Sequence, residues 1–213
     1  MAPERVPALM DDLMAYLNRD DVPAMVQAAI GHAQFESIHA FTDGNGRIGR
    51  ALVSAVLRRR GVTRNAVAPL ASGLLAERDE YFAALGDYRR GDPAPVIELF
   101  ARSARAAAVC SRESIARIKA LPEEWAKELR PRAGSAVAAL IPAFYDHPVM
   151  AADEIEQRSG SSEPQTYKAI ARLEEAGFIQ EITGRKRDRV WVVAELLAEL
   201  DDLDRRIQAE MKA

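Results

Sequence analysis

Apolar residues recur at three- and four-residue intervals through most of the first 120 residues, and this spacing is typical of amphipathic helices. In the segment 6–18, the residues that share one helix face are Leu9, Met10, Leu13 and Leu17. Further helices are expected over residues 22–38, 69–86 and 95–121, with another from Asn45 to Arg60. The pattern therefore predicts a mainly α-helical first domain.

The helix expected from Asn45 to Arg60 carries an apolar stripe with a 3.6-residue period. The stripe consists of Ile48, Ala51, Leu52, Ala55 and Val56. Three arginines occupy the last turn, where they suit the negative end of the helix dipole, and Gly61 follows as a residue that readily ends a helix. We expect the stripe to face the core.

Composition excludes several classes of protein. The chain has 213 residues, 48% of them hydrophobic and 29% charged, as in globular proteins. It has no apolar stretch of the roughly 20 residues that cross a membrane, and no secretory signal is visible. Cys110 is the single cysteine, which excludes an internal disulfide and fits a reducing cytoplasm. The net charge of −3 argues against nonspecific coating of nucleic acid.

Charge is unevenly distributed along the chain. Residues 1–120 hold 16 basic and 14 acidic side chains, residues 121–135 hold 3 of each, and residues 136–213 hold 10 and 15. The middle segment is polar, with a proline near each end and a closing glycine, which favours a linker that can contain a short helix at Glu123–Leu129. We therefore expect a helical domain at 1–120, a linker at 121–134, a second domain at 135–194 and a terminal helix at 195–213.

The segment from His39 to Arg50 concentrates residues that suit phosphate chemistry. Gly44 and Gly46 allow a sharp turn and a close approach by a ligand, since neither has a Cβ atom. The helix that begins there offers unpaired amides and a partial positive charge to an anion. Arg47 and Arg50 lie three residues apart on one face and can clamp a polyphosphate.

Two further residues of the segment complete a site for phosphoryl-type transfer. Asp43 can hold Mg²⁺ against the phosphates, and His39 can act as a general base near neutral pH. Each residue also has a structural interpretation: a helix-terminal histidine, an N-cap aspartate, and solvated arginines around a common turn. No Walker A motif occurs, so a P-loop does not hold the phosphates.

The segment resembles the signature of the Fic family, His-Pro-Phe-x-(Asp/Glu)-Gly-Asn-Gly-Arg-x-x-Arg, and differs from it at Ala40. Residues 32–38 resemble the helix that precedes the signature in the family. Residues 78–85, followed by Gly91 and Asp92, resemble the helices after it. The likeness covers about Val6 to Leu121.

The resemblance implies transfer of AMP from ATP to a Ser, Thr or Tyr hydroxyl of a target protein. It implies that His39 is the general base, Asp43 the Mg²⁺ ligand, and Phe41 a buried anchor of the loop. The residues implied in phosphate binding are Gly44, Asn45, Gly46, Arg47 and Arg50. The matching residues do not identify the base of the nucleotide.

Two features of the family find no counterpart in this sequence. Five residues precede Val6, so the β-hairpin flap that binds targets is expected to be missing from this sequence. Either the sequence is a fragment of a longer protein, or this member lacks the usual target dock and its transferase activity is impaired. No inhibitory Ser/Thr-x-x-x-Glu-Gly/Asn motif is found. The alternative function is a transcription regulator that senses nucleotide without turning it over.

Residues 135–194 show a different pattern. Helices are expected at 135–145, 151–158 and 163–176, and strands at 178–182 and 190–193, joined by a basic tip. This order predicts a small α+β winged helix-turn-helix domain after the helical one. Trp125 and Trp191 are expected to be packing residues. A terminal helix, Ala194–Met211, is expected to pack on the wing or on a partner.

The winged helix raises the question of DNA binding. Its candidate contacts are Gln165, Thr166, Lys168, Arg185, Lys186 and Arg187. The basic tip at 185–189 carries a net charge of +3 and can contact phosphates, but residues 136–213 carry −5. Docking of a protein partner and homodimer formation therefore remain alternatives to DNA binding.

Overall fold

The computed structural model describes residues 3–185 and 187–213. The chain divides into two compact units, one formed by Met1–Cys110 with Asp204–Ala213 and the other by Ser111–Leu203. Each unit is described separately. The prediction of a mainly α-helical chain with a small α+β part is confirmed.

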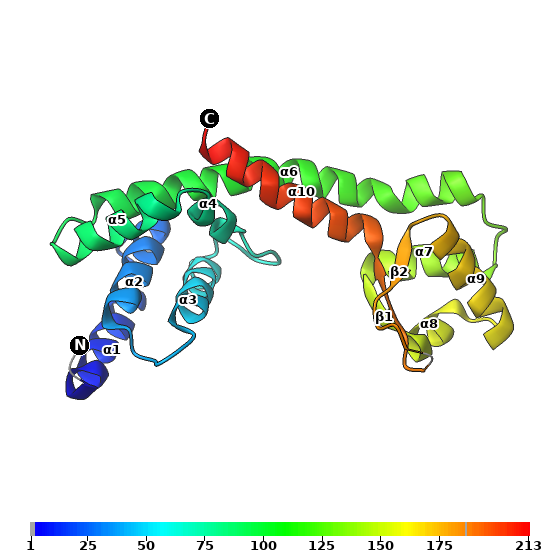
Figure 1. The fold of residues 1–213 in the computed structure, drawn as a ribbon, viewed down its shortest axis with the longest axis horizontal. Helices are drawn as coiled ribbons and strands as arrows, with labels where there is room; N and C mark the ends of the chain where they lie inside the picture. The colour runs from blue at the N-terminus through cyan, green and yellow to red at the C-terminus, as the bar shows by residue number, and fades with distance from the viewer. Residues whose placement is uncertain (1–2, 186) are drawn as a thin grey trace. The chain divides into compact units, whose positions relative to one another are not determined.

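The first unit is helical throughout its secondary structure. After a 3₁₀ turn at Pro3–Arg5, its elements are α1 (Val6–Leu17), α2 (Ala24–Ile38), α3 (Asn45–Arg59), α4 (Leu70–Ala76), α5 (Arg78–Arg89), the first part of α6 (Ala94–Leu129) and the last part of α10 (Ala194–Met211). Helix α2 packs against both α1 and α3, and its fully buried side chains include Phe35 and Ile38 (Figure 1). This packing positions the α2–α3 connection.

The apolar stripe predicted for α3 does not coincide with the face of the helix that is buried. The buried face consists of Asn45, Gly49, Val53, Val56 and Leu57, whereas Ile48 is 40% exposed. The close approach of α2 decides the phase, because a Cβ atom at Gly49 would lie 2.7 Å from Glu36 Oε1 and 3.0 Å from His32 Cε1. A glycine thus faces α2 where periodicity predicted a larger residue.

The carboxyl end of α3 is tied to the connection between α1 and α2. Arg60 donates hydrogen bonds from Nη1 to the Val22 carbonyl at 2.8 Å and to Gln27 Oε1 at 2.9 Å. Arg59 donates to Asp20 Oδ1 at 2.8 Å. These bonds hold the end of α3 that lies away from the His39–Arg50 segment.

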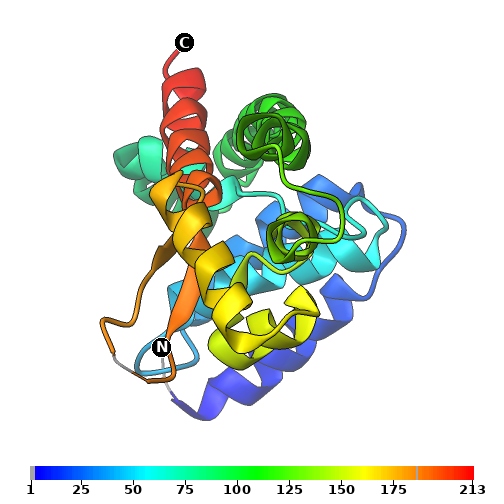
Figure 2. The same cartoon turned by 90° about the vertical axis from the view of Figure 1, so that its right-hand side faces the viewer.

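The second unit combines helices with a three-stranded sheet. Its elements are the rest of α6, α7 (Ala136–Asp146), β1 (Val149–Ala151), α8 (Ala152–Ser159), α9 (Glu163–Glu175), β2 (Ile179–Glu181), β3 (Val190–Val193) and the first part of α10 (Ala194–Met211). The strands are antiparallel in the order β1-β3-β2, with Met150 opposite Trp191 (Figure 2). Strand β1 was not predicted, because three residues are too few to show alternation.

Residues 121–129, expected within a linker, lie inside α6. Trp125 is 2% exposed, and its ring stacks on Phe178 at 4.8 Å between centroids. Its indole Nε1 donates to a carboxylate oxygen of Glu195. The segment is therefore helical because it contributes to the core of the second unit, and only residues 130–135 separate α6 from α7.

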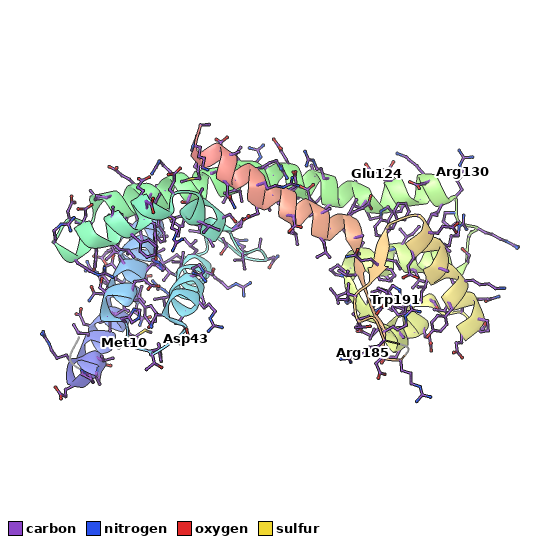
Figure 3. The ribbon with its side chains drawn as sticks, viewed as in Figure 1. Met10, Asp43, Glu124, Arg130, Arg185 and Trp191 are labelled. Carbon is purple, nitrogen blue, oxygen red and sulfur yellow. The ribbon has the colours of Figure 1, made fainter. Side chains whose placement is uncertain are left out.

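Trp191 has the same packing role that was expected of it. It is fully buried, donates from Nε1 to Glu174 Oε1 at 2.9 Å, and lies under the guanidinium of Arg189 at 4.5 Å. Figure 3 labels Trp191 within the second unit. Over the described part of the chain, none of the helices is both long and apolar enough to span a membrane.

Candidate functional site

His39 ends α2 in a left-handed conformation. Its backbone has φ 53° and ψ 57°, and its N–H donates to the Phe35 carbonyl at 3.0 Å. A left-handed residue just past a helix pairs an otherwise free carbonyl and turns the chain, although residues other than glycine adopt it uncommonly. The imidazole of His39 is exposed. It is therefore accessible at the start of the connection to α3.

Asn45 holds this connection in place. Its side chain is 3% exposed, and the amide donates from Nδ2 to the Phe41 carbonyl at 2.6 Å. The Phe41 N–H in turn donates to Asn45 Oδ1 at 3.0 Å. This reciprocal pair makes the Asn45 side chain a support of the loop, and it leaves the backbone N–H of Asn45 for an anion.

The amino end of α3 has no side-chain cap. Gly44 precedes the helix with φ 86°, a conformation that glycine adopts without strain, and its carbonyl accepts the first helical bond from Ile48 N–H at 3.0 Å. Within residues 3–185 and 187–213, no acceptor pairs with the backbone amides of Asn45, Gly46 or Arg47. These amides and the helix dipole form an anion-binding end.

Asp43 and Arg47 form an exposed ion pair across this end of the helix. Arg47 Nη2 lies 3.2 Å from Asp43 Oδ2, with the two side chains 75% and 90% exposed. Figure 3 labels Asp43 in the first unit. Exposed pairs of this kind contribute about 0–1 kcal/mol. A phosphate group can therefore displace the carboxylate from Arg47, which leaves Asp43 for a hard cation.

Arg50 extends back over the glycine turn. A Cβ atom at Gly46 would lie 3.3 Å from Arg50 Nη1, so the glycine makes room for this side chain. The same arginine lines a cavity of about 410 Å³ together with His32, Tyr81 and Phe82. In the part of the chain that the structure describes, Arg50 forms no ion pair.

The sequence alone assigned no role to His32 and Tyr81, which form a hydrogen bond in the first unit. His32 is 1% exposed, and its Nε2 shares a hydrogen bond of 2.8 Å with the Tyr81 hydroxyl. Burial lowers the pKa of His32, and burial raises the pKa of Tyr81 to about 12. The only sequence signal was the position of His32, at helical spacing from Glu36 and on the buried face of α2.

Two expected roles are corrected by the structure. Phe41 is 48% exposed, and its ring lies 6.3 Å from that of Phe35, so it is not a buried anchor. Thr166 is fully buried, and its hydroxyl lies 2.6 Å from Ser159 Oγ, so it cannot contact DNA. The exposure of Phe41 and Thr166 therefore depends on the contacts that each side chain makes in the fold and not on its residue type.

The remaining candidate DNA contacts lie at the surface of the second unit. Gln165 and Lys168 are exposed on α9. Arg185 and Arg187 are exposed in the connection between β2 and β3, where Figure 3 labels Arg185. Lys186 lies outside the described residues. The structure thus leaves four of the six candidates available to a ligand.

Comparisons with known proteins agree with the motif. Residues 1–57 match the model of the Fic/DOC family. Protein adenylyltransferase fic-1 of Caenorhabditis briggsae is 33% identical over 109 residues, which cover 50% of this chain and 20% of that protein. Probable protein adenylyltransferase aq_aa38 of Aquifex aeolicus is 33% identical over 90 residues, covering 42% and 26%.

A solved structure is also similar to this chain. A Fic family protein from Desulfovibrio desulfuricans G20 is 25% identical, and the match covers 90% of this chain and 55% of that one, with a TM-score of 0.48. The family-model match and the sequence relatives confirm the resemblance drawn from the His39–Arg50 segment. The chain spans 20% and 26% of the length of the two adenylyltransferases.

Proposed function

We propose that this chain, whose residues 1–57 match the Fic/DOC family model, transfers AMP from ATP to a side-chain hydroxyl of a target protein. One observation carries the proposal: a single connection presents an exposed imidazole, His39, beside the uncapped amino end of α3 and two arginines. The names of the relatives support adenylyl transfer as the reaction.

In the proposed reaction, His39 takes the proton of the target hydroxyl. The oxygen then forms a bond to the α-phosphorus, and the bond between that phosphorus and the leaving pyrophosphate breaks. The free amides of Asn45, Gly46 and Arg47 stabilise charge on the transferring group, because they point out of the helix end. Arg47 and Arg50 bind the β- and γ-phosphates, and Gly44 gives the chain its turn.

Asp43 is the residue that fits a Mg²⁺ ion in this scheme. Mg²⁺ in nucleotide sites is commonly held by one or two carboxylates together with substrate phosphates. The Asp43 carboxylate is exposed next to the anion-binding end, and its arginine partner is weakly held. The ion supplies neutralisation of the phosphate charge when bound.

Transfer of label from α-labelled ATP tests the proposal. We expect label on a target protein band in the presence of Mg²⁺. His39→Ala should reduce labelling by about 10²–10⁴-fold, the usual contribution of a general base, and leave ATP binding measured by calorimetry intact. The matched control is His147→Ala, since His147 is exposed after α7 in the other unit.

Two outcomes would contradict the proposal, one for the role of His39 and one for the reaction itself. Equal labelling by the His39→Ala variant and the wild type would exclude His39 as the base. Nucleotide binding without any labelling would favour the sensor alternative. Competition by unlabelled GTP, CTP and UTP identifies the base, which the named residues do not contact.

A second candidate function, duplex DNA binding by the second unit, is favoured by the order α7, β1, α8, α9, β2, β3. We propose that this unit contains a winged helix with α9 as its recognition helix. The exposed Gln165, Lys168, Arg185 and Arg187 support contact with the duplex. A gel shift with the gene's own upstream DNA tests it, and absence of a shift contradicts it.

A further inference from the structure

A cavity of about 570 Å³ opens in the second unit beside the loop between α6 and α7. This volume lies within the range of small-molecule sites. Its lining comes from that loop, the first residues of α7 and one side of α9, and consists of Arg132, Ala133, Gly134, Ser135, Ala136, Val137, Ser161, Gln165, Lys168, Ala169 and Arg172. The proposed transfer reaction does not use this cavity, whereas Gln165 and Lys168 of its lining are also candidate DNA contacts of α9.

The charge of the lining is entirely positive. Arg132, Lys168 and Arg172 contribute three cations, and no carboxylate lines the cavity. The unit as a whole is acidic, since Ser111–Leu203 contains 13 basic and 17 acidic residues, a net charge of −4. A local excess of positive charge in an acidic unit is therefore a property of this cavity and not of the surface in general.

The cations of the cavity are free of carboxylate partners. Among the residues that the structure describes, none of Arg132, Lys168 and Arg172 forms an ion pair, whereas Lys127 in the same unit pairs with Glu123 at 2.7 Å. Neighbouring like charges repel one another, and a bound anion would remove that repulsion. The cavity thus lacks the counter-charge that an anionic ligand would supply.

The loop that presents Arg132 is held in one conformation. Pro131 fixes its own φ, and the Ser135 N–H donates to the Arg132 carbonyl at 3.0 Å, which closes a turn. Gly134 completes the turn with φ 74°, where a Cβ atom would be strained. The backbone that presents Arg132 is therefore ordered before a ligand binds, which lowers the backbone part of the entropy cost of binding.

The side chain of Arg172, on the α9 side of the cavity, is also held in place by a hydrogen bond. Arg172 donates from Nη2 to the Leu129 carbonyl, which anchors one nitrogen and leaves the rest of the guanidinium for a ligand. The floor consists of the buried Ala136, Val137 and Ala169, whose small side chains leave the space open. Exposed Gln165 adds a polar group at the rim.

We propose that this cavity binds a phosphate group. Guanidinium forks pair with phosphate oxygens through two hydrogen bonds each, and a lysine adds a point charge. The phosphate can belong to a free phosphorylated small molecule or to the backbone of duplex DNA. The duplex source rests on the second candidate function, whereas the site itself depends on neither proposed function.

Binding measurements on the full chain test the site. The chain carries Arg47→Ala and Arg50→Ala, so that the first unit does not bind the probes. Pyrophosphate is titrated by calorimetry, and a short labelled DNA duplex by fluorescence anisotropy. We expect at least one probe to bind, and Arg132→Ala or Lys168→Ala to weaken that binding about tenfold or more, as for a lost charged hydrogen bond.

The pyrophosphate and duplex titrations distinguish a free phosphorylated ligand from the DNA backbone. Binding of pyrophosphate alone assigns the cavity to a free phosphorylated ligand. Binding of the duplex, with its salt dependence lowered by about one unit of slope in Lys168→Ala, assigns it to the DNA backbone. Lys127→Ala is the matched control, because Lys127 is exposed in the same unit outside the cavity.

Two outcomes overturn the proposal. One is that neither probe binds. The other is that Lys168→Ala and Arg132→Ala weaken binding no more than Lys127→Ala does. The altered side chains are exposed, so circular dichroism is expected to show folded variants throughout.

Discussion

At the scale of single residues, Asn45 connects the fold to the site. Its amide makes both hydrogen bonds that the backbone of Phe41 offers, while its own N–H belongs to the anion-binding end of α3. A glutamine would place the amide one methylene too far from Phe41. The loop geometry therefore depends on this one side chain, even though the chemistry is assigned to its neighbours.

We predict that Asn45→Ala destabilises the chain by about 1–3 kcal/mol, because a donor and an acceptor of Phe41 lose their partners. Thermal unfolding measures the change. Asp43→Ala is the control for stability, since its exposed ion pair contributes about 0–1 kcal/mol. Equal stability of Asn45→Ala and the wild type would show that the clamp does not form.

His32 gives the chain a pH-dependent stability. Burial lowers its pKa below the ordinary value of 6.5, so the folded chain resists protonation that the unfolded chain accepts. We predict that the free energy of unfolding falls as the pH drops below about 6.5, by at most about 1.4 kcal/mol per pH unit for this one proton.

Denaturant unfolding between pH 7.5 and 5.5 checks this dependence. His32→Gln should flatten the curve, because glutamine does not titrate. His147→Gln should retain the wild-type curve, since His147 is exposed. The prediction is contradicted if the two variants show the same pH dependence.

At the scale of elements, α6 continues through residues 121–129, although the local sequence there does not favour a helix strongly. Packing of this segment explains the continuation. Pro122 lies inside it and lacks an N–H, which removes one helical hydrogen bond. The burial of Trp125 between Phe178 and Glu195 outweighs that loss. The sequence therefore indicated a linker with a short helix at Glu123–Leu129, whereas tertiary contacts make this segment continuous with the rest of α6.

We predict that Trp125→Ala destabilises the second unit by about 3–5 kcal/mol, the cost of removing a large buried aromatic side chain. Hydrogen exchange should rise in α7 and α9. Glu124→Ala, at the exposed neighbouring position, should change stability by less than about 0.5 kcal/mol. A loss of stability in Trp125→Ala no larger than that in Glu124→Ala would indicate that residues 121–129 act as a linker.

At the scale of the whole molecule, the acidic and histidine residues do not gather into a metal site. No group of three or more His, Cys, Asp or Glu that could hold a metal occurs in residues 3–185 or 187–213. In the proposed function, Mg²⁺ binds at Asp43 together with the nucleotide, whose phosphates supply the remaining oxygen ligands.

We predict that calorimetry with Mg²⁺ alone gives no saturable binding, whereas Mg²⁺ with ATP binds. EDTA should abolish label transfer, and excess Mg²⁺ should restore it. Asp43→Ala should raise the Mg²⁺ concentration that half-restores transfer, while His147→Ala should not. Tight binding of Mg²⁺ to the nucleotide-free chain would contradict this account.

Local patterns in the sequence predicted most of the helices and the candidate residues of the site. Helical periodicity predicted α1, α2 and α3, and a twelve-residue segment contained the imidazole, the turn glycines and both arginines. These features depend on neighbours within about four residues, the range over which a helix turn or a tight turn is determined. The family resemblance rested on the same short segment.

Tertiary structure decided which of these side chains are buried. The close approach of α2 at Gly49 determines which face of α3 is buried. Thr166 is buried in contact with Ser159, and Trp125 is buried in contact with Phe178. The hydrogen bond between His32 and Tyr81 joins residues 49 positions apart. Such contacts depend on how whole elements meet, and periodicity along one element carries no information about its partner.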